Sequence, residues 1–334
     1  MIDKFIYRIG IDKVTLYNFD FEIMPGENEI INSLEIEKES NVKRIIIKNE
    51  LCNILDVCYN GEENKRYKLI SFNPNKILEG HNIRNSTPKE LKKAMEKLKD
   101  YLKEKGAIIN FENAKIKEIE ININIPVNFL EFKETFRVLM KPLGKYQEIS
   151  DINQSEKIKE STELESLFAK INNNTILRIY NKSKESNINT SISRIEFSIK
   201  KGSLNYYLGK LGKENNINVL FENENIITDI FKDKLNKIFK KTLEYVEKKK
   251  IVLKNEYIAF KNAGRLAKKY GRKEHRGIYT HLEKMGIFDY NILIDIIKTC
   301  SLGNVWRETQ TVKNKYSHIN NIEKLNYLME FINK

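Results

Sequence analysis

The sequence contains little cysteine and no long apolar run, and each absence excludes a class of protein. Its three cysteines, Cys52, Cys58 and Cys300, form no Cys-x-x-Cys pair and indicate reduced thiols, not a disulfide framework or a zinc site. The apolar runs are only a few residues long, whereas a membrane-spanning helix needs ~18 residues. The N-terminal residues carry a charge every few positions and lack the apolar core of a signal peptide. We therefore expect a cytoplasmic protein with no membrane partner.

Histidine is also scarce, and several common motifs are missing. The four histidines form no His-x-His or His-x-x-x-His pair, which argues against the usual zinc and paired-histidine metal sites. There is no Gly-x-x-x-x-Gly-Lys-Ser/Thr loop for nucleotide phosphates, and no Gly-x-Ser-x-Gly sequence. Carboxylates are therefore the remaining candidates for binding a hard divalent cation, either Mg²⁺ or Mn²⁺.

Positive charge, in contrast, is abundant. The chain has 59 Lys and Arg against 46 Asp and Glu, a net charge of +13. Such an excess favours a polyanionic partner, either nucleic acid or an acidic membrane surface. With 334 residues, of which 40% are hydrophobic, the chain is long enough for two folded domains.

The first part of the chain shows the patterns of short strands. Runs of β-branched and aromatic residues predict strands at residues 5–9, 13–19, 43–48 and 66–72. Asn60-Gly61 is a strong signal for a hairpin turn, and we expect Glu22 to Glu39 to form an acidic loop.

A helix start follows at residues 87–90. Thr87 is placed to be its N-cap, Pro88 its first residue and Glu90 the partner in a capping box. The helix should end near Gly106. Another helix is expected around Phe129–Leu139.

Three later segments combine an aliphatic face with a polar one. The segments Lys115–Ile125, Thr175–Glu185 and Ser191–Lys200 alternate in the manner of strands, whose successive side chains point to opposite faces. The polar faces carry Glu120, Arg178, Tyr180, Lys182, Arg194 and Glu196. A phenol flanked by cations is a setting in which tyrosine can attack a phosphate. The alternative is that the three polar faces are simply solvated. Because all three segments have the same arrangement, with one aliphatic and one polar face, we favour a functional site.

From Asn216 onwards the periodicity is helical and the charge strongly basic. Residues 226–246 predict a long amphipathic helix, and residues 232–276 contain 16 Lys and Arg against 5 Asp and Glu. A second helical unit, 258–270, breaks at Gly271 and resumes towards residue 285, which is the outline of a helix-turn-helix but is common in α domains generally. The residues expected to contact DNA are Lys248, Lys249, Lys250, Arg265, Lys268, Lys269, Arg272, Lys273 and Arg276.

These patterns together predict an α+β fold, an antiparallel sheet with helices packed on one face, followed by a basic all-α C-terminal domain. We place the α+β domain at residues 1–212, a basic linker helix at 213–250 and a helical DNA-binding domain at 251–334.

Four motifs, in their order along the chain, resemble those of a known family. They are Gly80-His-Asn-Ile83, Glu118–Ile125, Leu177–Glu185 and Arg194–Lys200. This order resembles the rolling-circle replication initiators of phages and plasmids, in particular the filamentous-phage gene II and gene X type. The resemblance extends to Phe260–Tyr270 and Tyr279–Asp289 and covers roughly residues 66–295.

The resemblance implies an enzyme that nicks one strand of origin DNA at a specific site and rejoins it. It implies Tyr180 as the nucleophile that forms a 5′-phosphotyrosyl bond and frees a 3′-hydroxyl primer. Asn181 stands where the family has Asp, and Glu118 and Glu120 stand where it has the Arg and Asp of an Arg-Ile-Asp strand. Glu120 and Glu196 are then the expected ligands of Mg²⁺ or Mn²⁺.

The same resemblance suggests roles for the cations and for partners. Lys182 would hold the phenolate or the phosphate, while Arg178 and Arg194 would neutralise the developing charge. The nicking domain would act on double-stranded and single-stranded origin DNA. A host helicase would supply unwinding because no P-loop is present, a host polymerase would extend the primer, and a homodimer is compatible with these features.

Alternatives remain open on the residues alone. Tyr206 or Tyr207, in an expected helix, could replace or assist Tyr180, and His81 could be a further metal ligand or a structural residue. At the level of function, a non-catalytic, winged-helix plasmid initiator or copy-control protein would lack a convergent polar site. An interaction protein with solvated basic helices would show no salt-dependent affinity for DNA.

Overall fold

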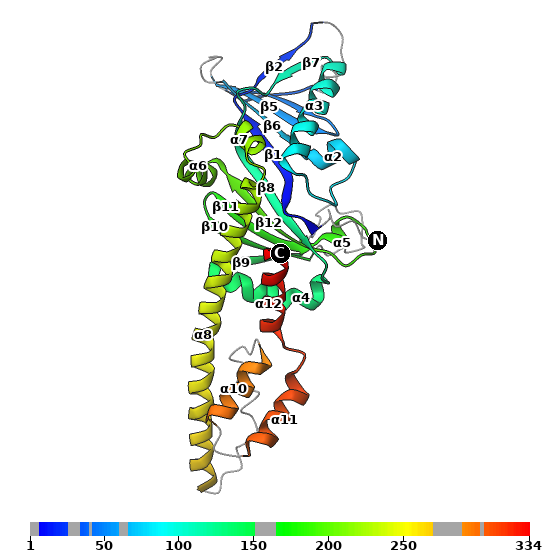
Figure 1. Ribbon diagram of the computed structural model, residues 1–334. Coiled ribbons are helices and arrows are strands. Elements are labelled where there is room, and N and C mark those ends of the chain that lie inside the picture. The colour runs from blue at the N-terminus through cyan, green and yellow to red at the C-terminus, as the bar shows by residue number, and fades with distance from the viewer. Residues whose placement is uncertain are drawn as a thin grey trace. The chain divides into compact units, whose positions relative to one another are not determined.

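The computed structural model describes residues 7–25, 34–39, 42–59, 66–150, 165–269, 289–300 and 304–334 (Figure 1). The chain divides into two compact units. The first contains Met1–Phe129 and Gln147–Asp233, and the second contains Leu130–Tyr146 and Lys234–Lys334. Mixed sheet and helix followed by C-terminal helices confirms the predicted α+β class.

The described strands form one large sheet and a separate two-stranded ribbon. In spatial order the sheet contains β3 (Leu34–Glu39), β4 (Val42–Lys48), β5 (Cys52–Tyr59), β6 (Arg66–Phe72), β1 (Gly10–Tyr17), β8 (Lys115–Ile125), β12 (Ser193–Lys200), β11 (Thr175–Asn181), β10 (Glu165–Asn172) and β9 (Tyr146–Ser150). The ribbon pairs β2 (Asp20–Ile23) with β7 (Ala107–Asn110). Every pairing whose register is described is antiparallel, as predicted.

The helices of the first unit are short apart from α3. They are α2 (Pro74–Glu79), α3 (Pro88–Glu104), α5 (Lys182–Glu185), α6 (Lys201–Lys210) and α7 (Asn218–Glu222). The α3 helix begins as predicted, because Thr87 and Glu90 form a reciprocal capping box and Pro88 follows the cap. It ends at Glu104, just before Gly106, whose φ of 97° favours glycine.

The two faces of the sheet differ in the way the alternation predicts. Ile119, Ile121 and Ile123 of β8 are at most 3% exposed, and their cross-strand neighbours on β12 include Phe197. The Phe197 ring packs edge-on against Phe231, with ring centroids 5.2 Å apart. Burying a large apolar side chain contributes about 1.5–3 kcal/mol, so this face holds the first unit together. The opposite face of β8 is free to carry polar groups.

Three predictions about local structure need correction. Leu34 and Ile36 alternate with Glu35 and Glu37, and residues 34–39 form the edge strand β3 paired with β4, not a loop. Glu22 and Ile23, at the start of the same predicted loop, belong to β2. A high density of charged residues is also typical of loops, which is why the segment was predicted as one. On an edge strand, such charges discourage pairing with a further strand. Residues 26–33 of that segment lie outside the described residues. The second correction concerns the strand predicted at residues 5–9. Residues 5–6 lie outside the described residues, and the first observed strand begins at Gly10.

The third correction concerns the strand expected at Thr175–Glu185. Strand β11 ends at Asn181, whose side-chain oxygen accepts a hydrogen bond from the Lys184 N–H and caps α5. Asn is a strong N-cap residue because its side chain competes for backbone donors, and alternation gave no sign of this. The predicted hairpin turn at Asn60-Gly61 lies outside the described residues, although the flanking β5 and β6 do pair antiparallel.

The second unit is helical in its described parts. Its elements are most of α4 (Phe129–Met140), the 3₁₀ turn η3 (Lys141–Leu143), most of α8 (Ile226–Lys269), α10 (Tyr290–Cys300), α11 (Val305–Tyr316) and α12 (Asn321–Asn333). The long helix predicted from Ile226 is confirmed, and it continues through Ile258 to Lys269 without a break. Residues 270–288, where the turn of a helix-turn-helix was predicted, lie outside the described residues.

Polar contacts connect the helices of this unit. Glu308 accepts hydrogen bonds from the Tyr257 hydroxyl at 2.7 Å and from the Lys261 ammonium at 2.8 Å, which ties α11 to α8. Thr135 of α4 donates to Asn321 of α12 at 2.7 Å. In the described part of the chain, no helix combines the length and apolar character needed to cross a membrane.

Candidate active site

Three carboxylates on adjacent strands of the first unit converge on the polar face of the sheet. Asp12 of β1, Glu120 of β8 and Glu196 of β12 each offer an oxygen, and these oxygens lie within 4.8 Å of one another. Glu120 and Glu196 were predicted from the sequence to bind a metal, and Asp12 was not. Three convergent carboxylate oxygens are the type of ligand set that Mg²⁺ and Mn²⁺ prefer.

Asp12 reaches this cluster because of an irregularity in β1. Ile11 pairs with Ile121 and Lys13 pairs with Glu120, so Asp12 is an extra residue in the ladder. A bulge of this kind redirects a side chain and is common beside active sites. In the sequence, Asp12 lies between the two runs, 5–9 and 13–19, that predict strands, so strand alternation did not assign it to a face.

Arg178 of β11 joins two of the carboxylates. One of its guanidinium nitrogens lies 3.0 Å from Glu196 Oε1 and 3.4 Å from Glu120 Oε1. Burial, followed by the charge of Glu196, nevertheless raises the pKa of Glu120 to about 7. Burial, followed by the charge of Asp12, also raises the pKa of Glu196 above its ordinary value. Both carboxylates therefore hold a proton more strongly than usual, first because they are buried and second because other carboxylates lie close by.

Tyr180 of β11 lies beside this cluster. Its hydroxyl donates a hydrogen bond to Glu196 Oε2 at 3.3 Å. Burial raises the pKa of the phenol well above its ordinary value, while the charge of Arg194 acts in the opposite direction. The structure thus places Tyr180, Glu196 and Arg194 together, as the strand alternation predicted.

Arg194 of β12 is fully buried, and protein groups hold it in place. Its guanidinium donates to Asn124 Oδ1 at 2.7 Å, to Asp12 Oδ1 at 3.1 Å and to the carbonyls of Asn82 and Ile83 at 3.0 and 2.7 Å. The ionic partner and the carbonyls compensate the cost of burying the charge. Arg194 therefore fixes Asp12 and also anchors the loop that follows α2.

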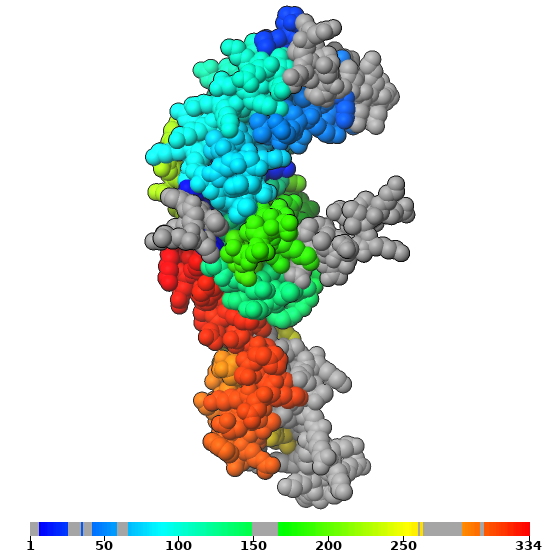
Figure 2. All heavy atoms as spheres, turned by 90° about the vertical axis from the view of Figure 1, so that its right-hand side faces the viewer, coloured from blue at the N-terminus to red at the C-terminus, as the bar shows by residue number. Residues whose placement is uncertain are grey.

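That loop lies over the end of the site. Asn124 donates to the Ile83 carbonyl at 2.8 Å, and Asn82 contacts Glu185 of α5 at 3.5 Å. Figure 2 shows the cyan surface of α2 and the following segment next to the green surface around α5. The motif Gly80-His-Asn-Ile83 thus contacts the site through the carbonyls of Asn82 and Ile83 and through the Asn82 side chain.

Lys182 begins α5 and does not continue β11. Its side chain is fully buried and forms an ion pair with Glu185. Burial, followed by the charge of Arg194, lowers the pKa of its ammonium group. Lys182 therefore lies close to Arg194, with its charge compensated by Glu185.

Asn122 is a further buried group of this face that sequence reasoning did not single out. It is opposite Glu196 in the register of β8 and β12, and its side chain is completely buried. Neither its Oδ1 nor its Nδ2 atom has a hydrogen-bond partner among the described residues. An unpaired buried amide is costly, which points to a ligand that uses it.

The alternative residues lie elsewhere. His81 is exposed, with its Nε2 atom 3.7 Å from Glu79, and it is not part of the three-carboxylate cluster. Tyr206 of α6 is 68% exposed and lies beneath Lys210, whose Nζ is 4.5 Å from the ring centroid. Burial and then the charge of Asp233 raise the pKa of Tyr207. The contacts of both tyrosines thus involve residues outside the cluster.

The predicted DNA-binding residues belong to the second unit. Lys248 is exposed on α8, while Lys249 and Lys250 are half-buried, and Lys250 lies 3.3 Å from Asp295. The side chains of Arg265, Lys268 and Lys269 are not described, although their backbone is part of α8. Arg272, Lys273 and Arg276 lie outside the described residues. A DNA-binding role for this segment stays a prediction.

Comparison with known proteins identifies the family of the chain and distant similarities to solved structures. Residues 1–217 match the phage family described as the N-terminal part of the replication-associated gene II protein. Among solved structures, a rolling-circle replication initiator protein from Geobacillus stearothermophilus is 9% identical. The match covers 69% of this chain and 84% of that chain, with a TM-score of 0.38. No curated protein matches the sequence.

Proposed function

The chain belongs to the phage gene II family of replication-associated proteins, and we propose on that basis that it initiates rolling-circle replication by nicking and rejoining origin DNA. Tyr180 is the nucleophile in this proposal. The observation that carries it is the hydrogen bond from the Tyr180 hydroxyl to Glu196, inside a cluster of three carboxylates and two arginines.

The proposed reaction is a transesterification. The phenolic oxygen of Tyr180 attacks the scissile phosphorus, and Glu196, 3.3 Å away, accepts the phenolic proton. The bond between phosphorus and the 3′ oxygen breaks, and that oxygen takes up a proton to become the primer hydroxyl. The new phosphotyrosyl bond conserves the energy of the phosphodiester, so the reverse attack by a 3′-hydroxyl reseals the strand without ATP.

The neighbouring cations have distinct roles in this scheme. Arg178 is the more accessible arginine, with 38% of its side chain exposed, and it can bind the phosphate while it holds Glu120 and Glu196. Arg194 is completely buried, so it acts on the phenol by lowering its pKa against the effect of burial. Lys182, at the start of α5, adds a second positive charge close to Arg194.

The carboxylate cluster fits a divalent cation. Three oxygens within 4.8 Å, raised carboxylate pKa values and the unpaired Asn122 amide are all features that a bound positive ion would compensate. Asp12, Glu120 and Glu196 would hold Mg²⁺ or Mn²⁺, with the Asn122 oxygen as a further donor. When bound, the ion would polarise the phosphate and stabilise its added negative charge.

The decisive experiment looks for the covalent intermediate. Purified protein is incubated with labelled DNA from the origin of its own replicon and Mg²⁺ or Mn²⁺, and an SDS-resistant adduct is sought. We expect the adduct in the native protein and its complete loss in Tyr180→Phe. Tyr101→Phe, on α3, is the matched control and should form the adduct normally.

Two other outcomes would redirect the proposal. An adduct that survives Tyr180→Phe but disappears in Tyr206→Phe or Tyr207→Phe would move the nucleophile to α6. Tight, salt-sensitive DNA binding without any adduct would favour a non-catalytic initiator. In that case the basic helix α8, with exposed Lys248, is the first region to test for duplex contacts.

The proposed reaction also involves a DNA substrate and host proteins. Origin DNA is the substrate in both its duplex and its unwound form, and a partner helicase separates the strands. A host polymerase then extends the 3′-hydroxyl.

A further inference from the structure

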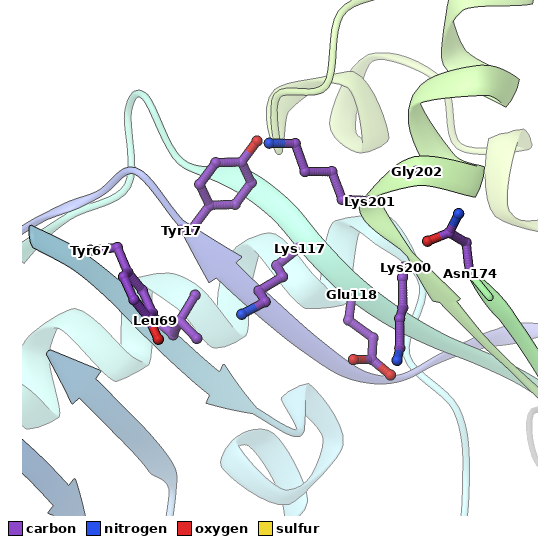
Figure 3. Close-up of a pocket in the computed structure, with 9 residues that line it drawn as sticks. All are labelled: Tyr17, Tyr67, Leu69, Lys117, Glu118, Asn174, Lys200, Lys201 and Gly202. Carbon is purple, nitrogen blue, oxygen red and sulfur yellow. The ribbon is translucent and has the colours of Figure 1, made fainter. Parts of the chain in front are cut away.

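A pocket of about 490 Å³ opens on the sheet beside the proposed active site (Figure 3). Its lining includes two tyrosines and three lysines, together with one glutamate: Tyr17, Tyr67, Lys117, Lys200, Lys201 and Glu118. They come from β1, β6, β8, β12 and the start of α6. All these residues lie in the first unit.

The pocket and the carboxylate cluster share one face of the sheet. On β8, Glu118 lines the pocket and Glu120 belongs to the cluster, and alternate strand residues point the same way. On β12, Lys200 and Glu196 are related in the same manner, with Lys200 paired to Glu118. At ~3.3 Å per residue, Lys200 is about 13 Å along the strand from Glu196. A single strand stacked at ~3.4 Å per nucleotide covers that distance in about four nucleotides.

The tyrosines present aromatic rings to the pocket, and ammonium groups lie over them. Lys201 Nζ is 4.6 Å from the centre of the Tyr17 ring, and Lys117 Nζ is 5.7 Å from that of Tyr67. Tyr67 is 40% exposed. A base that stacks on either ring would take the place of the ammonium group, which then becomes available to a phosphate.

The charge of the pocket selects an anionic partner. Lys117, Lys200 and Lys201 are exposed, and Glu118 is the one acidic residue in the lining. The Ser198 hydroxyl donates a hydrogen bond to the Glu118 carboxylate and so holds that carboxylate against the sheet. The three lysines of the lining outnumber this single acidic residue. Aromatic rings interleaved with cations are the features that bind single-stranded nucleic acid irrespective of sequence. A duplex keeps its bases stacked internally and cannot use the rings.

We propose that this pocket binds the unwound DNA strand next to the scissile phosphate, with bases stacked on Tyr17 and Tyr67 and phosphates bound by Lys117, Lys200 and Lys201. The inference rests on the proposed nicking function for the identity of the strand. It adds a binding site that keeps the opened origin in place while Tyr180 reacts.

The test measures binding separately from chemistry. Full-length Tyr180→Phe protein, which cannot form the adduct, is titrated into a fluorescein-labelled 15-nucleotide thymidine strand, and the anisotropy is followed at several NaCl concentrations. Because stacking on an aromatic side chain is worth at least about a fivefold change in affinity per base, Tyr17→Ala and Tyr67→Ala should each weaken binding by about that factor or more. Lys200→Gln and Lys201→Gln should each lower the salt slope by about 0.7.

Conservative variants distinguish the loss of a stacking ring from misfolding of the protein. Tyr17→Phe and Tyr67→Phe keep the stacking ring and should bind normally, whereas Tyr17→Leu and Tyr67→Leu keep apolar bulk and should bind weakly. The matched control is the Tyr101 and Lys105 pair of α3, in which Lys105 also lies over a tyrosine ring at 5.8 Å but outside the pocket. Tyr101→Ala and Lys105→Gln should leave the affinity for the strand unchanged.

The outcomes separate this inference from the proposed function. Unchanged affinity in the alanine and leucine variants, or an equal loss of affinity for a blunt duplex of the same length, would overturn the pocket as a single-strand site. If native protein forms no adduct but the pocket variants still weaken strand binding, the nicking proposal fails and the pocket stands. If the adduct forms and the variants bind normally, the reverse holds.

Discussion

Tyr180 Oη donates a hydrogen bond to Glu196 Oε2 across neighbouring strands, and the two residues occupy the same polar face of the sheet. The contact couples the acidity of the phenol to a carboxylate whose own pKa is raised by burial and by Asp12. A carboxylate with a raised pKa is a better proton acceptor than an ordinary one. The pair therefore has the geometry and the proton affinity for activating the nucleophile.

We expect Glu196→Gln to lower the nicking rate by about 10²–10⁴-fold, because a positioned general base contributes that much and an amide cannot accept the phenolic proton. The single-turnover rate on labelled origin DNA should be measured at saturating Mg²⁺, which separates proton transfer from weaker ion binding. Glu104→Gln, on the exposed end of α3, serves as the control. A rate within about threefold of the native value would remove Glu196 from the proton-transfer step.

Much of this site is visible in the alternation of β8, β11 and β12. Glu120, Arg178, Tyr180, Arg194 and Glu196 occupy one face because side chains in a strand repeat every two residues. The capped start of α3 is equally local, since Thr87, Pro88 and Glu90 carry the signal themselves. Features that depend only on residues within one helix or strand can therefore be predicted from the sequence.

Features that depend on tertiary context could not be derived in the same way. Alternation does not distinguish a solvated arginine from Arg194, which is buried because Asp12 and the loop carbonyls come from distant parts of the chain. Asp12 joins the cluster through a bulge that exists only when β1 pairs with β8. The end of β11 was missed for a different, local reason: the Asn181 side chain caps α5 and turns Lys182 away from the strand, and this cap competes with the strand alternation.

Asn122→Leu should raise the thermal midpoint of the ion-free protein and reduce the increase in midpoint produced by Mg²⁺ or Mn²⁺. Each buried, unpaired polar group costs about 1–3 kcal/mol, and leucine of similar volume removes both the Oδ1 and Nδ2 atoms. The loss of an oxygen ligand weakens the binding of the ion, so the two shifts have opposite signs. Differential scanning fluorimetry with and without the ion measures both. An unchanged ion-induced shift would show that Asn122 does not contact the ion.

The pKa of Glu120, raised to about 7, gives the metal affinity a defined pH dependence. A bound cation needs the carboxylate form, so the affinity should be constant above pH 7 and fall by up to about tenfold per pH unit below it. Calorimetric titration of Mn²⁺ at several pH values, in buffers of different ionisation enthalpy, measures the affinity and the released proton. Glu120→Gln should flatten this profile.

The ion-free protein should show the opposite trend in stability. Because the pKa of Glu120 is higher in the folded chain than its ordinary value of 4.5, the folded state binds the extra proton between these limits. The free energy of unfolding should therefore fall as the pH rises from about 4.5 to 7 and level off above that range. A urea denaturation series on native protein and Glu120→Gln isolates this contribution, which the variant should lack.

Arg194→Met should destabilise the first unit by about 3–5 kcal/mol, because it strands the buried Asp12 carboxylate and several hydrogen-bond acceptors. Arg194→Lys keeps the charge but lacks the planar fork that reaches Asn124, Asp12 and the loop carbonyls at the same time, so it should recover only part of this loss. Urea unfolding of both variants provides the stability comparison. Arg66→Lys, which changes the contact with Asp56 at a partly exposed site, is the control and should cost about 1 kcal/mol or less.

The same pair of variants separates the structural role of Arg194 from its effect on Tyr180. If the charge of the arginine lowers the pKa of the phenol, Arg194→Met should shift the limb of the pH–rate profile set by the phenol to higher pH, whereas Arg194→Lys, which keeps the charge, should shift it less, both measured under conditions where the protein is fully folded. A purely structural arginine would reduce the amount of active protein and leave the position of that limb unchanged. The position of the limb therefore distinguishes a residue that only supports the loop from one that also tunes the nucleophile.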